Sequence, residues 1–120
     1  MQPIKPIQYD DLIIGEPEIV FQVDARNFVR LYIGTFNTLM DYGLPGEDGL
    51  WQGIVLNYHL VDAFYDEPEW VVPEPEVYLQ SLKAINVAPD NPATQTVQSK
   101  LIRLFEYALQ QDLKVTINYF

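Results

Sequence analysis

The sequence predicts an α+β fold, with about four helices packed on a small sheet formed by N-terminal strand(s) and a C-terminal strand. Residues Glu18 to Asp24 and Leu113 to Tyr119 alternate apolar and polar side chains with the two-residue period of a strand. Between them, apolar residues recur at the three- and four-residue spacings of amphipathic helices. Because strands need partners, we expect the C-terminal strand to lie beside Glu18–Asp24, with the helices on one face.

The first strand is expected at Glu18–Asp24, where Ile19, Phe21 and Val23 share one face. A short strand at Leu12–Ile14 could pair with it across the turn at residues 15–17, which contains Gly and Pro. The alternation predicts that this part of the sheet buries one of its two faces.

A helix is predicted next, over about Ala25 to Tyr42. Asp24 is placed to cap its first turn, because a carboxylate there can accept hydrogen bonds from unpaired amides. Gly43, followed by Leu and Pro, is typical of a helix end. The apolar stripe of this helix comprises Phe28, Val29, Tyr32, Ile33, Phe36, Leu39 and Met40.

The segment from Leu50 to about Asp66 fits two patterns. Ile54, Tyr58 and Val61 belong to a helical stripe, but alternate residues of the same segment are also apolar, as in a strand. We predict a helix here, and the strand remains the alternative. The loop before it, residues 43–49, has three Gly and one Pro, which favour turns.

Residues 66–76 form an acidic linker broken by three prolines, for which regular structure is not expected. A short helix is predicted over Pro75–Ile85. Asn91 and Pro92 then suit the cap and first position of a helix that runs to about Gln111. The chain ends in the predicted strand Leu113–Tyr119.

Size and composition predict a single globular domain over residues 1–120. Hydrophobic residues make up 48% of the chain, which favours a folded core over disorder. The chain has no Cys, and no apolar run approaches the length of a membrane span, so we expect a cytoplasmic protein that uses no disulfide and no membrane anchor.

The acidic residues gather in the middle of the chain. The net charge is −10, and residues 31–82 hold nine carboxylates but no Lys or Arg, while the remainder is almost neutral. The acidic segment, residues 41–76, is also rich in aromatic residues and includes both tryptophans. This composition disfavours direct binding to nucleic acids or anionic membranes and favours a basic protein partner.

Catalytic and metal-binding motifs are not evident in the sequence. The only histidine, His59, could approach Asp62 and Asp66 on a helix, but such spacing is common on solvated helix faces, and we expect no metal site. Ser81 and Ser99 lack the surroundings of a nucleophile. We therefore expect no cofactor and no enzymatic activity.

The function expected from these observations is that of an acidic protein-binding inhibitor, such as an immunity protein or antitoxin that neutralises a basic nuclease-type bacterial toxin by direct binding. The alternative is a structural or adaptor protein of a phage or cellular assembly that acts by self-association through exposed strand edges. Trp is favoured at interfaces because it buries a large area at small entropic cost. The expected partner-binding residues are Asp41, Glu47, Asp48, Trp51, Asp62, Asp66, Glu67, Glu69, Trp70 and Glu74.

Overall fold

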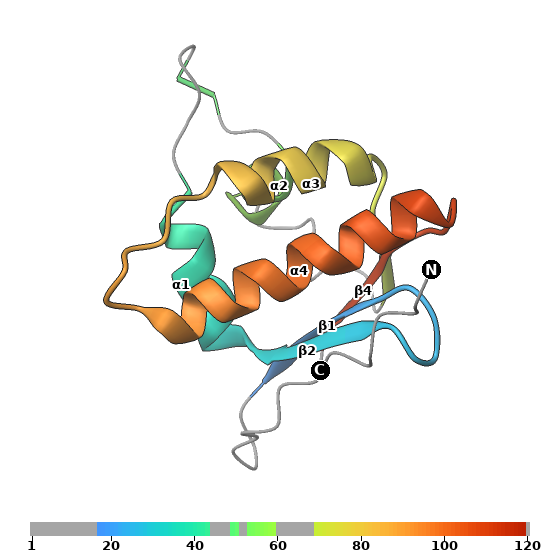
Figure 1. Ribbon diagram of the computed structural model, residues 1–120, viewed down its shortest axis with the longest axis horizontal. Coiled ribbons are helices and arrows are strands. Elements are labelled where there is room, and N and C mark those ends of the chain that lie inside the picture. Colours follow the sequence, from blue (N-terminus) through green and yellow to red (C-terminus); the bar gives the residue numbers. More distant parts are fainter. Residues whose placement is uncertain (1–16, 44–48, 51–52, 60–68, 120) are drawn as a thin grey trace.

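Helices cover one face of an antiparallel sheet in the computed structural model, which describes residues 17–43, 49–50, 53–59 and 69–119 (Figure 1). The described part contains four helices and one four-stranded sheet, so the predicted α+β class is confirmed. The sheet has the strand order β2-β1-β4-β3. Its strands are β1 (Glu18–Gln22), β2 (Phe28–Tyr32), β3 (Glu69–Val71) and β4 (Thr116–Tyr119).

The C-terminal strand lies beside the first strand, as predicted. β4 runs antiparallel to β1, with Phe21 opposite Ile117, and Thr116 donates its hydroxyl proton to the Gln22 carbonyl at 3.2 Å. β1 is flanked by β4 on one side and by β2 on the other. The strand predicted over Leu12–Ile14 falls outside the described residues, and within the described sheet both sides of β1 are already occupied.

The prediction of a helix over Ala25–Tyr42 is wrong for the first half of this segment, where β2 forms instead. β1 and β2 make a hairpin, and α1 (Ile33–Asp41) begins only after β2 ends. Asp24 caps the hairpin turn, not a helix: its Oδ1 accepts from the backbone N–H groups of Arg26 and Asn27 at 2.8 and 2.9 Å. The carboxylate therefore stabilises a chain reversal that the spacing of apolar residues does not reveal.

The remaining helices follow the predictions more closely. α2 (Gly53–His59) confirms helix over strand for its part of the segment 50–66, whose residues 60–66 lie outside the described residues. α3 (Pro75–Ala84) and α4 (Pro92–Gln110) begin at prolines, and Asn91 Oδ1 accepts from the Thr94 N–H at 3.3 Å. Pro at the first helical position loses no intrahelical bond, which explains why these two starts were predictable.

β3 corrects the expectation that the segment 66–76 has no regular structure. Glu69–Val71 pairs antiparallel with β4, and the Val72 N–H donates to the Val115 carbonyl at 2.9 Å. The prolines at 73 and 75 follow the strand, so they do not interrupt its ladder. β3 is an outer strand of the described sheet, where such a short strand is tolerated.

The core lies between the sheet and the helices. Phe21 of β1 contacts Phe36 of α1 and Phe105 of α4, with ring centroids 5.7 and 6.3 Å apart, and Tyr78 of α3 contacts Phe105 at 5.8 Å. These four aromatic rings are almost fully buried. α4 packs on β2 and α3, and α3 packs on α2, so α4 links the sheet to the outer pair of helices (Figure 1).

Candidate functional site

The acidic segment contributes three carboxylates that the structure describes and exposes. Asp41 ends α1, Glu74 directly precedes α3, and Glu76 lies in the first turn of α3. Between described residues, ion pairs join Arg30 to Glu18 and Lys83 to Glu106, and none includes these three carboxylates. These three carboxylates are therefore exposed, and they make no ion pair with a described residue.

The described carboxylates do not form one compact patch. In Figure 1 the C-terminal end of α1 and the N-terminal end of α3 lie on opposite sides of the helical layer, so Asp41 and Glu74 belong to different parts of the surface. Glu69 lies in β3, where its backbone pairs with Asn118. The other predicted partner-binding residues lie outside the described residues: Glu47, Asp48, Trp51, Asp62, Asp66 and Glu67.

The aromatic residues of the acidic segment that are described point inward. Trp70 pairs opposite Ile117 and packs against the core with its side chain partly buried. Burial raises the pKa of the nearby Tyr78 hydroxyl to about 12, while the Trp70 indole acts in the opposite direction. Trp70 thus packs against the core, and the partner contact expected from the sequence stays a prediction.

Tyr58 joins α2 to α1 near one of the exposed carboxylates. Its hydroxyl donates to Asn37 Oδ1 at 3.1 Å, and its ring meets Phe36 edge-on at 5.6 Å. Burial raises the pKa of Tyr58, and the negative charge of Asp41 raises it further. The acidic segment therefore buries aromatic side chains inside and exposes carboxylates outside, at least where it is described.

The candidate catalytic side chains have structural or solvent-facing positions. Ser81 Oγ accepts from the Ile54 N–H at 3.1 Å and donates to the Tyr78 carbonyl at 2.8 Å, so it joins the start of α2 to α3. His59 is exposed and its ring contacts Tyr58. Among the described residues, no three His, Asp or Glu side chains gather as a metal site would require.

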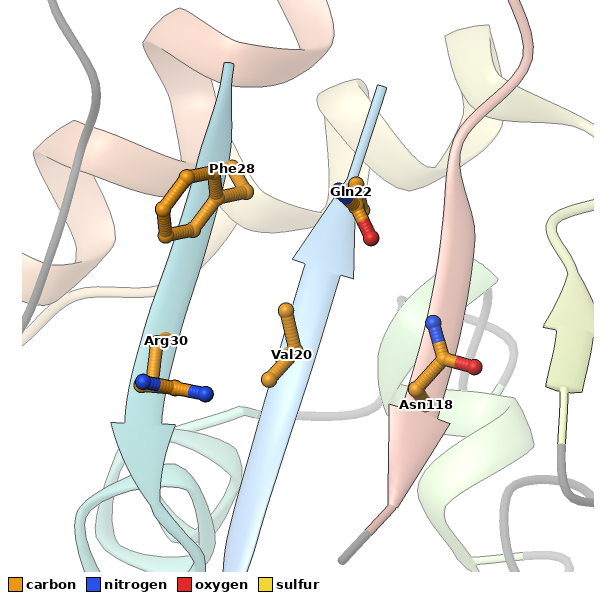
Figure 2. Close-up of a pocket in the computed structure, with 5 residues that line it drawn as sticks. All are labelled: Val20, Gln22, Phe28, Arg30 and Asn118. Carbon is orange, nitrogen blue, oxygen red and sulfur yellow. The ribbon is translucent and has the colours of Figure 1, made fainter. Parts of the chain in front are cut away.

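A small pocket on the sheet face away from the helices was not predicted from the sequence. It has a volume of about 190 Å³ and is lined by Val20 and Gln22 of β1, Phe28 and Arg30 of β2, and Asn118 of β4 (Figure 2). Val20 lies between Arg30 and Asn118 in the strand register, and Gln22 lies opposite Phe28. The pocket combines an apolar floor with one cation and two carboxamides.

The sequence contains a pattern that indicates this pocket, but the prediction of a helix over residues 25–42 led away from it. Phe28 and Arg30 alternate with Val29 and Leu31, which are buried in the core, so the two sets occupy opposite faces of β2. Recognition of the strand would have placed Arg30 on the outer face beside Val20. The predicted helix instead placed Phe28 and Val29 on one apolar stripe. It did not place Arg30 beside Val20.

No protein-family model, curated protein or solved structure matches this chain. In the part of the chain that the structure describes, no helix is both long and apolar enough to cross a membrane. Inferences about function therefore depend on the charges, contacts and burial described above.

Proposed function

We propose that this protein is an acidic inhibitor that binds a basic protein directly, as an immunity protein or antitoxin that neutralises a nuclease-type bacterial toxin. The observation that carries the proposal is the separation of charge along the chain. Residues 31–82 contain nine carboxylates and no Lys or Arg, and the described Asp41, Glu74 and Glu76 are solvent-exposed without an ion-pair partner among the described residues.

Electrostatics explain why such a surface suits a nuclease. An enzyme that acts on nucleic acids must hold phosphates, so its substrate cleft is positively charged. The negative charge of the segment 31–82 is attracted to that cleft and accelerates encounter by roughly 10 to 1,000 fold at low salt. Occupation of the cleft excludes the nucleic acid and stops catalysis without any chemistry by the inhibitor.

A non-catalytic role also agrees with the way polar side chains are used. Ser81 bridges two helices, Asn91 caps α4, and Tyr58 and Tyr78 donate to asparagine side chains. Each of these groups serves the packing of helices. The exposed carboxylates Asp41, Glu74 and Glu76 take no part in these contacts and are available for a partner.

The test uses the protein that is encoded beside this gene in its source genome, which the proposal expects to be basic. We expect a 1:1 complex by calorimetry, loss of the partner's nuclease activity at equimolar inhibitor, and an affinity that falls at least about tenfold between about 50 and about 300 mM NaCl. Glu106→Gln is a control, because this residue lies outside the acidic segment. A neighbouring protein that is neither basic nor bound would contradict the proposal.

A second candidate function is that of a structural or adaptor protein in a phage or cellular assembly. It is favoured by the open sheet, whose outer strands in the described part are β2 and β3. Sedimentation distinguishes the two functions. A monomer that forms a salt-sensitive complex with a basic protein supports the inhibitor, whereas a stable homo-oligomer on its own supports the adaptor.

A further inference from the structure

The outer edge of β2 offers backbone groups that the described sheet does not use. Val23 donates its N–H to the Asn27 carbonyl at 3.0 Å, and Ile33 donates to the Pro17 carbonyl at 3.0 Å. Hydrogen-bonded pairs alternate in an antiparallel ladder, so Asn27, Val29, Leu31 and Ile33 direct their backbone groups toward β1. The backbone N–H and C=O groups of Phe28 and Arg30 therefore point away from the sheet.

These two residues also have their side chains in the pocket on the outer face. Figure 2 shows Phe28 and Arg30 on β2, beside Val20 and Gln22 of β1, with Asn118 of β4 on the other side of β1. An extended chain that paired with β2 could thus place a side chain of its own near the pocket.

The pocket's polar groups favour a carboxylate. Glu18 Oε2 lies 3.0 Å from Arg30 Nε, and the guanidinium of Arg30 has further N–H donors beyond this one contact. The Asn118 carboxamide is without a hydrogen bond to a described residue, and Gln22 uses only its Nε2, which donates to the Asp24 carbonyl at 3.2 Å. A guanidinium with free donors binds a carboxylate through charge-assisted hydrogen bonds.

The volume of the pocket suits a single amino-acid side chain better than a whole metabolite. Small-molecule sites usually measure about 300 to 1,000 Å³, and this pocket has about 190 Å³. It is open to the outer sheet face and has an apolar floor at Val20 and a wall at Phe28, which suit the methylene groups of a short acidic side chain.

We infer that β2 is a docking edge for an extended peptide segment of another protein, which adds an antiparallel or parallel strand and seats an Asp or Glu side chain against Arg30. Strand addition supplies affinity through main-chain hydrogen bonds, and the pocket supplies specificity. The partner is a different protein, because the β2 strand of a second copy, Phe28–Tyr32, contains no Asp or Glu that could be placed against Arg30. β2 and the pocket lining include none of Asp41, Glu74 and Glu76, so the inference does not depend on the proposed inhibitor function.

The test is amide hydrogen exchange of the full-length protein, measured by NMR. In the free protein, the amides of Val29 and Leu31 exchange slowly and those of Phe28 and Arg30 exchange fast, since only the first pair bonds to β1. The probe is the acetylated, amidated heptapeptide Thr-Val-Thr-Glu-Thr-Val-Thr at about 2 mM. It slows exchange at Phe28 and Arg30 by at least about tenfold and leaves Val29 and Leu31 unchanged.

Matched peptides and variants distinguish the contribution of the backbone hydrogen bonds to binding from the contribution of the pocket. Lys in place of the central Glu weakens binding at least about tenfold, as does methylation of one alternate set of peptide amides, whereas methylation of the other set has little effect. Arg30→Gln removes the preference for Glu over the peptide with central Gln, and Arg26→Gln, which changes an exposed arginine in the hairpin turn, keeps it.

Three results would overturn the inference. The first is unchanged exchange at Phe28 and Arg30 with the Glu peptide. The second is equal binding of the Lys peptide, which excludes the carboxylate site. The third is slow exchange of these two amides in the free protein: a dependence on protein concentration would identify a second copy as the occupant, and no such dependence would identify a segment of the same chain.

Discussion

The Asp24 carboxylate accepts a hydrogen bond from the Asn27 backbone amide at 2.9 Å and two more from the Asn27 side chain at 2.9 and 3.1 Å. Asn27 is almost fully buried, although it lies in the turn between β1 and β2. This pair closes the hairpin and directs the chain back along β1. It thereby fixes which side chains of β2 face the core and which face the pocket.

Asp24→Ala is predicted to destabilise the protein by about 1 kcal/mol. The substitution removes the acceptor of several hydrogen bonds, including those from the backbone N–H and the side-chain Nδ2 of the buried Asn27, in a turn that is partly exposed. Urea denaturation measures the effect. Asp90→Ala, at an exposed position before α4, is the matched control and should change the free energy of unfolding by less than about 0.5 kcal/mol.

The same carboxylate predicts a dependence of stability on pH. Burial alone would raise the pKa of Asp24, but hydrogen bonds from Arg26, Asn27 and Tyr107 outweigh it and hold the pKa below 3.8. A lowered pKa in the folded state stabilises the fold above the unfolded value of about 4, and this contribution is lost as pH falls through the folded value. The stability difference between the native protein and Asp24→Asn should therefore shrink as pH falls from about 6 to about 2. A difference that stays constant or grows over this range would contradict the assigned hydrogen bonds.

Gly53→Ala is predicted to cost about 3 kcal/mol, because two effects combine. Gly53 has φ of +60°, and an added Cβ would lie 2.5 Å from Ser81 Oγ and 2.8 Å from the Val77 carbonyl oxygen. Gly49 is the matched control, since its φ is +79° and nothing lies within 4 Å of an added Cβ. Gly49→Ala should cost only about 1 kcal/mol in the same denaturation experiment. Equal costs would show that the close approach of α2 to α3 is absent.

Tyr78→Phe is predicted to reduce the loss of stability at alkaline pH. The Tyr78 hydroxyl donates to Asn57 Oδ1 between α3 and α2, and burial raises the pKa of Tyr78 to about 12. Because the unfolded tyrosine ionises near about pH 10, the native protein loses stability as pH rises from about 10 through about 12. Denaturation at several pH values should show a smaller decline for Tyr78→Phe, by on the order of 2 kcal/mol. An unchanged decline would show that Tyr78 ionises freely in the folded protein.

The elements that sequence reasoning predicted best have local signals. Asn91 and Pro92 start α4 through a side-chain cap and a missing amide, both of which act within one turn. β1 and β4 alternate because one sheet face is buried under helices. Their pairing then follows from the need of each strand for a partner.

β2 was not predicted because both the helical spacing and the two-residue period of a strand fit residues 28–32. Phe28, Val29 and Tyr32 follow the helical spacing that continues through Phe36, and Asp24 suits both a helix cap and a turn. The choice is made by tertiary structure, since β1 supplies a partner strand on which residues 28–32 form a ladder. The outer-face pocket was missed for the same reason.

The candidate acidic surface was predictable in part. Exposure of Asp41 and Glu74 follows from their charge, and the structure agrees for both. The position of Trp70 was not predictable, because its strand depends on pairing with residues near the C-terminus, more than forty positions later. A local sequence pattern does not predict contacts between residues that lie so far apart in the chain.

The most direct measurement of the central claim compares two triple variants in binding to the basic partner at low salt. Asp41→Asn, Glu74→Gln and Glu76→Gln neutralise three exposed charges of the segment 31–82, and Asp90→Asn, Glu106→Gln and Asp112→Asn neutralise three charges elsewhere. Both sets change the net charge equally. We predict that the first set raises Kd at least about tenfold and the second less than about threefold. Equal effects of the two sets would contradict a binding role for the acidic segment.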